Sequence, residues 1–113
     1  MAKSYPRRDV IGGAAASAVV LTTSPLFAAE PIAHDIAIKA LKFEPDVVQV
    51  HVGDTIRWTN HDLALHTATA DEFGWDTAEI AKNETAEITV IDGMENTYFC
   101  IFHPHMKGSI EIL

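Results

Sequence analysis

One cysteine, Cys100, is present in the 113 residues of this chain, and this scarcity excludes an internal disulfide bond. Basic residues are also few, since 8 Lys and Arg stand against 16 Asp and Glu. Nucleic-acid binding is therefore disfavoured, because it requires basic side chains that neutralise phosphates. No segment combines helical periodicity with capping residues, and there is no internal repeat or low-complexity tail. These absences leave a short acidic chain of one domain, without a predicted helix.

The first 29 residues differ in composition from the remainder. Adjacent Arg7 and Arg8 precede an apolar stretch over residues 10–27, and two alanines follow it. This layout is typical of an export signal of the twin-arginine type. We therefore expect residues 1–29 to be a signal peptide, with a cleavage bond that the sequence does not define, and residues 30–113 to be the mature domain. The alternative is an uncleaved anchor, because the apolar stretch nearly reaches the length that spans a bilayer.

Export would place the protein in the bacterial periplasm and change its charge. The signal holds three of the 8 basic residues and one of the 16 acidic residues, so the mature part has a net charge of −10 with neutral histidines. Such acidity favours a partner with a basic docking face, attracted less strongly in salt, although solubility alone also explains it. In an oxidising compartment an unpaired thiol is a liability unless a metal occupies it.

Alternation of apolar and polar residues with a period of two recurs along the mature part. Strands are predicted at residues 35–39, 48–52, 56–59, 86–90, 98–102 and 108–113. Turns are expected at Gly53-Asp54 and Asp92-Gly93. Short strands at regular spacing predict an all-β sandwich. Its core is expected to include six aromatic residues: Phe43, Trp58, Phe73, Trp75, Tyr98 and Phe99.

The most specific pattern in the chain lies near the C-terminus. Cys100, His103 and Met106 are separated by three and three positions, and His66 lies 34 positions before the cysteine. A thiolate, two imidazoles and a thioether are the ligands of a type 1 copper site, in which the cysteine and histidines form a plane and the methionine is a distant axial ligand. Any one of these residues alone is more often an ordinary core or surface residue. Zinc is the rival metal, but structural zinc sites rarely use a thioether.

The predicted ligand set also indicates the kind of chemistry. Cu(I) favours soft sulfur and Cu(II) favours nitrogen, and a mixed site is a compromise that changes little between them. A catalytic metal needs an open coordination position, which four protein ligands do not leave. We therefore predict one copper ion per chain that cycles between Cu(I) and Cu(II), in a protein that is not an enzyme.

Three runs of sequence carry a resemblance to a known family: VGDTIRWTN at residues 52–60, HTAT at residues 66–69 and YFCIFHPHMKG at residues 98–108. The chain resembles the cupredoxin (type 1 blue copper) family. Its short ligand loop looks most like that of amicyanin, with plastocyanin and pseudoazurin as more distant relatives. The resemblance implies a Greek-key β-sandwich with copper near one end, held by His66, Cys100, His103 and Met106. It further implies that Cys100 is the strongest ligand, Met106 the weak axial ligand and the edge of His103 the exit for electrons.

Two departures from the amicyanin-like pattern concern residues beside the ligands. Ile101 and Phe102 stand where such loops commonly have Thr and Pro. We hypothesise that the available backbone N–H of Phe102 donates to the Cys100 sulfur and raises the reduction potential. Thr67 stands where an Asn commonly ties the two ligand loops together, and a threonine offers fewer donors for that role.

The other histidines have no predicted role as ligands. His105 lies inside the ligand loop, where a solvent-exposed position is favoured over that of an alternate ligand. His61 is expected near the same end of the domain. His34 and His51 are expected to be ordinary surface residues.

The predicted function is that of a monomeric, periplasmic single-electron carrier between redox proteins, without stable membrane insertion once the signal is removed. The resemblance to amicyanin implies an amine dehydrogenase as donor and a c-type cytochrome as acceptor. The alternative is a periplasmic protein that binds and delivers copper, although such proteins usually expose labile Met-rich or His-rich sites. The ligand set disfavours a metal-free structural sandwich. An oxidase or nitrite reductase would need further copper centres and a longer chain.

Overall fold

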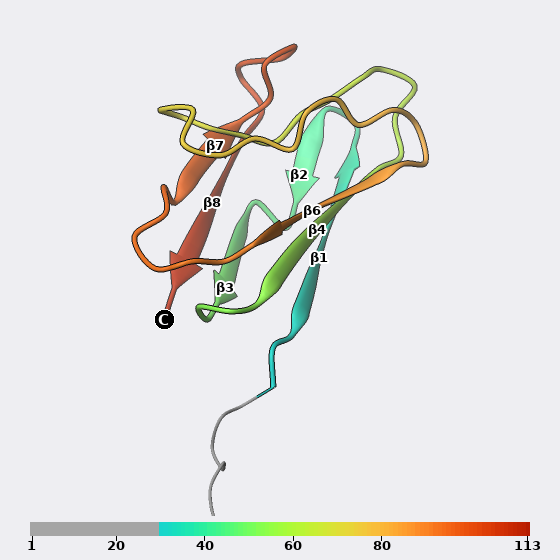
Figure 1. The fold of residues 1–113 in the computed structure, drawn as a ribbon. Coiled ribbons are helices and arrows are strands. Elements are labelled where there is room, and N and C mark those ends of the chain that lie inside the picture. Colours follow the sequence, from blue (N-terminus) through green and yellow to red (C-terminus); the bar gives the residue numbers. More distant parts are fainter. Residues whose placement is uncertain (1–29) are drawn as a thin grey trace, which may run out of the picture. The chain divides into compact units, whose positions relative to one another are not determined.

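Eight short β-strands form the part of the chain that the structure describes, which is residues 30–113 of a computed structural model (Figure 1). They are β1 Ala33–Lys39, β2 Lys42–Glu44, β3 Val47–Val50, β4 Thr55–Asn60, β5 Thr69–Ala70, β6 Thr85–Thr89, β7 Thr97–Phe99 and β8 Lys107–Ile112. These residues form no helix, so none of them belongs to a helix with the length and hydropathy needed to cross a bilayer. The predicted signal at residues 1–29 lies outside the described residues.

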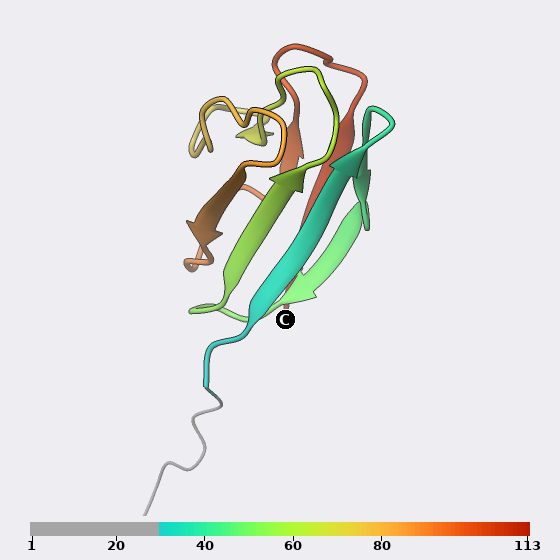
Figure 2. The same ribbon diagram turned by 90° about the vertical axis from the view of Figure 1, so that its right-hand side faces the viewer.

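The strands are arranged in two four-stranded sheets that face each other (Figures 1 and 2). The first sheet has the order β2-β1-β4-β6 and the second has the order β3-β8-β7-β5. Neighbouring strands are antiparallel except for two parallel pairs, β1 with β4 and β3 with β8. Parallel neighbours cannot be joined by a tight hairpin, so the chain crosses between the sheets to form them. This architecture confirms the predicted all-β sandwich.

Strand β4 illustrates how the alternation in the sequence produces the two faces of a sheet. Its buried side chains lie at alternate positions, Ile56, Trp58 and Asn60, and the residues between them are partly exposed. Trp58 meets Tyr98 of the opposite sheet, with ring centroids 5.5 Å apart and the indole Nε1 donating to the phenol oxygen over 3.4 Å. Burial raises the pKa of Tyr98 to about 12. The contact therefore joins the sheets through a neutral hydroxyl.

Gly108 allows a close contact within the second sheet. It lies opposite Tyr98 in the pairing of β7 with β8. A Cβ atom at this position would overlap Cζ, Cε1 and the hydroxyl oxygen of Tyr98. A glycine in a strand often marks such a close approach, and here it leaves room for the largest side chain of β7.

The prediction that Phe73 belongs to the core is wrong, because its side chain is 68% exposed. Phe73 lies in the turn after β5, where its N–H donates to the Ala70 carbonyl over 2.8 Å and its φ of 63° is left-handed. This turn directs the ring outward, against the ring of Phe99, which is itself only partly buried. Trp75 instead stacks on Trp58 with centroids 5.8 Å apart and supports the core.

Asp54 ties the beginning of β1 to the beginning of β4, at the turn predicted at Gly53-Asp54. Its buried carboxylate accepts the N–H groups of Ile32 and His51, each over 3.0 Å, and Nε2 of His34 over 2.8 Å. The hydrogen bonds from Ile32, His51 and His34, in that order of effect, lower the pKa of Asp54 to about 2. His34 is therefore a half-buried partner of Asp54 and not an ordinary surface residue, whereas His51 is exposed as predicted.

Candidate metal centre

The four predicted ligands lie on two loops at one end of the sandwich (Figure 2). His66 belongs to the connection from β4 to β5, and the other three belong to the connection from β7 to β8. The strand predicted at residues 98–102 is shorter than expected. It ends at Phe99, because Cys100 already belongs to the loop.

The spacing of three and three forms two consecutive turns. The His103 N–H donates to the Cys100 carbonyl over 3.1 Å, and the Met106 N–H donates to the His103 carbonyl over 2.8 Å. The Cys100 N–H closes the loop by donating to the Met106 carbonyl over 3.1 Å. Pro104 occupies the second position of the second turn, where its fixed φ is favourable. The loop therefore brings its three potential ligands together through its own backbone.

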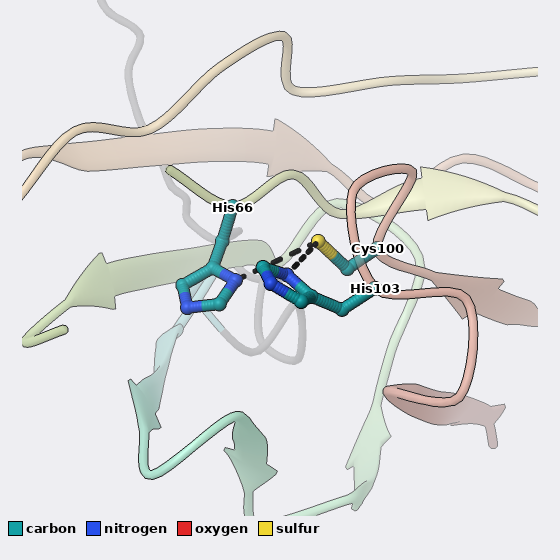
Figure 3. A group of neighbouring side chains, drawn as sticks. All are labelled: His66, Cys100 and His103. Atoms are coloured by element: carbon teal, nitrogen blue, oxygen red, sulfur yellow. Dashed lines mark hydrogen bonds between the residues drawn. The ribbon is translucent and has the colours of Figure 1, made fainter. Parts of the chain in front are cut away.

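Three donor atoms converge at this end of the molecule (Figure 3). The Cys100 Sγ lies 3.6 Å from Nδ1 of His66 and 3.8 Å from Nδ1 of His103. In a trigonal plane with bond lengths like those of Zn²⁺, about 2.1 Å to nitrogen and about 2.3 Å to sulfur, these donors would be about 3.8 Å apart. The observed separations therefore fit a first-row metal ion, and the mixture of sulfur and imidazole suits copper.

Met106 lies in the core, whereas the other two histidines of this end are exposed. Met106 is buried, with 2% of its surface exposed, and belongs to the same core cluster as Cys100. His105 is exposed, as predicted, and its ring lies edge-on to that of His103 at 6.2 Å between centroids. His61 is exposed directly after β4, which places it at this end as well.

Asp62 orients the buried ring of His66. Its Oδ2 lies 2.9 Å from Nε2 of His66, and since an ionised carboxylate only accepts, Nε2 carries the hydrogen and Nδ1 keeps a free lone pair. The same carboxylate accepts the N–H groups of Ala40 and Leu41 over 2.8 and 3.0 Å. Burial raises the pKa of Asp62, but the N–H groups of Leu41 and Ala40 and the His66 ring outweigh burial and hold this pKa below its usual value. Asp62 thus fixes which nitrogen of His66 faces Cys100.

Thr67 ties the two ligand loops together, in the role questioned at the sequence level. Its backbone N–H donates to the Cys100 Sγ over 3.4 Å, and its Oγ1 accepts the Ile101 N–H over 3.0 Å. The hypothesis that Phe102 supplies the N–H donor to the sulfur is wrong. Within residues 30–113 the backbone N–H that donates to Sγ is that of Thr67, and the turn that follows Cys100 gives Phe102 no hydrogen bond to Sγ.

The sequence analysis missed Asp62, Thr69 and Asp76. Asp62 could have been suspected, because a metal-binding histidine commonly donates its second ring N–H to a carboxylate, and Asp62 lies only four positions before His66. Thr69 and Asp76 carried no such signal. Their hydrogen bond, 2.6 Å between Thr69 Oγ1 and Asp76 Oδ1, depends on a turn that folds the chain back on itself.

Apolar side chains are exposed on both ligand loops. Leu63 and Leu65 precede His66 and are 86% and 42% exposed, and Ile101 and Phe102 follow Cys100 and are 45% and 44% exposed. His103 lies next to Phe102 in the chain and is itself partly exposed. Both ligand loops therefore expose apolar side chains, in a chain that is acidic overall.

Comparisons of sequence point to one group of proteins. The chain matches the model of the cupredoxin-like domain family over residues 13–112. Amicyanin of Paracoccus denitrificans is 28% identical over 110 residues, which cover 89% of this chain and 82% of the relative. Amicyanin of Paracoccus versutus is 24% identical over 107 residues, which cover 88% and 81%.

Comparisons of structure agree with those of sequence. An amicyanin variant in its Cu(I) form, with a methionine replaced by alanine, matches with a TM-score of 0.62 and 25% identity over 72% of this chain and 82% of that chain. A copper-containing nitrite reductase from Thermus scotoductus matches with a TM-score of 0.66 and 26% identity over 76% of this chain. The match covers only 23% of the reductase, so it concerns one part of a much larger protein.

Proposed function

Since this chain belongs to the family of cupredoxin-like domains, we propose that it is a type 1 copper protein that carries single electrons between redox proteins. The observation that carries the proposal is the convergence of His66, Cys100 and His103, whose donor atoms all lie within 4.8 Å of one another. Met106 completes the proposed ligand set as the axial thioether. One copper ion would bind per chain, and it would accept and release an electron by changing between Cu(II) and Cu(I).

The residues of the site have distinct roles in this proposal. Cys100 supplies a thiolate from a fully buried position, which keeps solvent from the sulfur. His66 is also fully buried and is held in one tautomer by Asp62. Two loops that are hydrogen-bonded to each other allow little rearrangement, and a site that changes little between oxidation states is suited to electron transfer.

His103 is the proposed exit for electrons. It is the only one of the three clustered donors with a partly exposed side chain. The exposed apolar residues of the two ligand loops would let a redox partner approach this imidazole closely, without the cost of removing water from charged groups. The acidity of the remaining chain favours a partner with a basic surface.

The location and partners belong to the same proposal. The composition of residues 1–29 supports export to the periplasm. The similarity to the two amicyanins supports a redox protein as donor and another as acceptor, such as a dehydrogenase and a c-type cytochrome. A monomer is expected.

The visible spectrum of the Cu(II)-loaded protein tests the proposal. A thiolate bound to Cu(II) should give an intense visible absorption, and Cys100→Ser should abolish it. His103→Ala should weaken or shift the band, whereas the exposed neighbour His105→Ala should leave it unchanged. A colourless Cu(II) protein, or equal effects of the two histidine variants, would refute the ligand assignment.

Voltammetry and copper exchange separate an electron carrier from a copper-delivery protein. The carrier should show a reversible one-electron couple and lose Cu(I) slowly to a chelator. Rapid transfer of Cu(I) to a chelator would instead favour delivery. The full burial of Cys100 and His66 favours the first result.

A further inference from the structure

A chain of hydrogen bonds joins a surface carboxylate to the backbone beside Cys100. The Thr69 hydroxyl donates to Asp76 Oδ1 over 2.6 Å, and the Oγ1 atoms of Thr67 and Thr69 are 2.9 Å apart. Thr67 Oγ1 accepts the backbone N–H of Ile101, the residue after the cysteine, over 3.0 Å. We name the three side chains of Asp76, Thr69 and Thr67 the threonine relay.

All hydrogen bonds of the threonine relay run in one direction. The single hydroxyl hydrogen of Thr69 is used on Asp76, so Thr69 Oγ1 can only accept from Thr67. The hydroxyl hydrogen of Thr67 is then also used, and its oxygen can accept the N–H of Ile101. Hydrogen bonds in such a chain polarise one another. The carboxylate therefore strengthens the bond at the far end.

Burial makes the threonine relay hard to replace by water. Thr67 and Thr69 are 3% and 0% exposed, and Asp76 at the end of the relay is exposed. The fold brings the parts together through two pairings of Thr69: it lies opposite Phe99 in the sheet, and its backbone bridges to Asp76. The relay consequently runs from the surface to the ligand loop through the protein interior.

We propose that the threonine relay is a positioning device that holds the backbone N–H of Thr67 against the Cys100 sulfur and thereby raises the reduction potential of the metal centre. The N–H lies 3.4 Å from Sγ, and the Thr67 side chain is held by Thr69 and Ile101. Donation to the sulfur stabilises its negative charge, which is greatest when the bound copper is Cu(I). The effect on the potential rests on the proposed function, whereas the positioning of Thr67 does not.

Hydrogen exchange in the metal-free protein tests the positioning. Thr69→Val keeps the shape of the side chain and removes its hydroxyl, so the Ile101 amide should exchange about tenfold faster, as expected for the loss of support worth one hydrogen bond. Thr69→Ser restores the hydroxyl and should exchange like the unaltered protein. An unchanged Ile101 rate in Thr69→Val, or equally fast exchange in Thr69→Ser, would overturn the proposal.

A pair of charge variants separates the relay from a simple nearby charge. Asp76 and Glu79 line the same surface hollow beside Thr67, Ile101 and Phe102. Asp76→Asn removes the charge that polarises the relay and should speed exchange at Ile101. Glu79→Gln removes an equal charge outside the relay and should not. If the two variants change Ile101 exchange alike, the relay has no role. This comparison also serves if Thr69→Val does not fold.

The copper-loaded protein gives the second readout. Thr69→Val leaves the charge of Asp76 in place, so its midpoint potential should fall and its visible band should shift, while Thr69→Ser should match the unaltered protein. A normal potential in Thr69→Val would refute the tuning of the metal centre. A colourless Cu(II) protein that still shows the exchange differences would refute the proposed function and leave the positioning of Thr67 intact.

Discussion

Replacement of Asp62 by alanine removes one carboxylate on which three N–H groups depend. One belongs to the buried ring of His66, and two belong to Ala40 and Leu41 in the turn between β1 and β2. Both turn residues have left-handed φ values, 54° and 59°. Asp62 therefore stabilises this hairpin turn as well as the orientation of a proposed ligand.

The magnitude of the effect follows from where each N–H lies. A hydrogen bond to a charged group contributes about 2 kcal/mol when water cannot replace it, and the fully buried His66 ring has no such replacement. The two turn N–H groups are exposed and can bond to water, so each loses only about 0.5 kcal/mol. The free energy of unfolding of the metal-free protein should therefore fall by about 3 kcal/mol in Asp62→Ala.

Urea denaturation followed by tryptophan fluorescence measures this change, since Trp58 and Trp75 lie in or against the core. Asp35→Ala is the matched control. Asp35 is 68% exposed and its bond to Arg57 is a surface ion pair, so this variant should lose much less stability than Asp62→Ala. Equal losses in the two variants would refute the role assigned to Asp62. Metal affinity gives a second check, because loss of an orienting partner typically weakens binding by about 10- to 100-fold.

Three further predictions concern the fold. Gly108→Ala should destabilise the protein by roughly 2 kcal/mol or more in urea denaturation, because the added Cβ overlaps the Tyr98 ring. An unchanged free energy of unfolding would show that this contact relaxes easily. The pKa of Asp54 lies below its usual 3.8, at about 2, so the stability that its carboxylate contributes is complete above about pH 4 and is lost as the pH falls toward 2. Asp54→Asn should therefore make the loss of stability with falling pH shallower over that range. An identical pH profile would contradict the hydrogen bonds assigned to Ile32, His51 and His34. Phe73→Ser should change stability by less than about 1 kcal/mol, because the ring is exposed, and a larger loss in thermal unfolding would restore Phe73 to the core.

Much of the site could be predicted from the sequence because most of the proposed ligands lie close together in the chain. Three of the four proposed ligands lie within seven consecutive residues, and a spacing of three and three closes two turns through neighbouring backbone groups. Softness of sulfur and the basicity of imidazole are properties of the side chains themselves, so the metal class follows from residue identity. The longer strands could also be predicted, since alternation at β4 reports directly which side chains face the core. The short strands β2 and β5, of three and two residues, were not predicted, because so few residues show no alternation.

Contacts between distant segments were decided only by the tertiary structure. The N–H donor to Cys100 comes from Thr67, 33 positions away, and not from the nearby Phe102. The bond from Thr69 to Asp76 requires a turn whose path no propensity predicts. Phe73 is as apolar as any core residue, but the left-handed turn that contains it directs its ring to the surface. Residue types thus determined which chemistry was available to this protein. The folding of the chain decided which groups hold, orient and polarise the sulfur, because hydrogen bonds depend on positions in space that separation along the sequence does not encode.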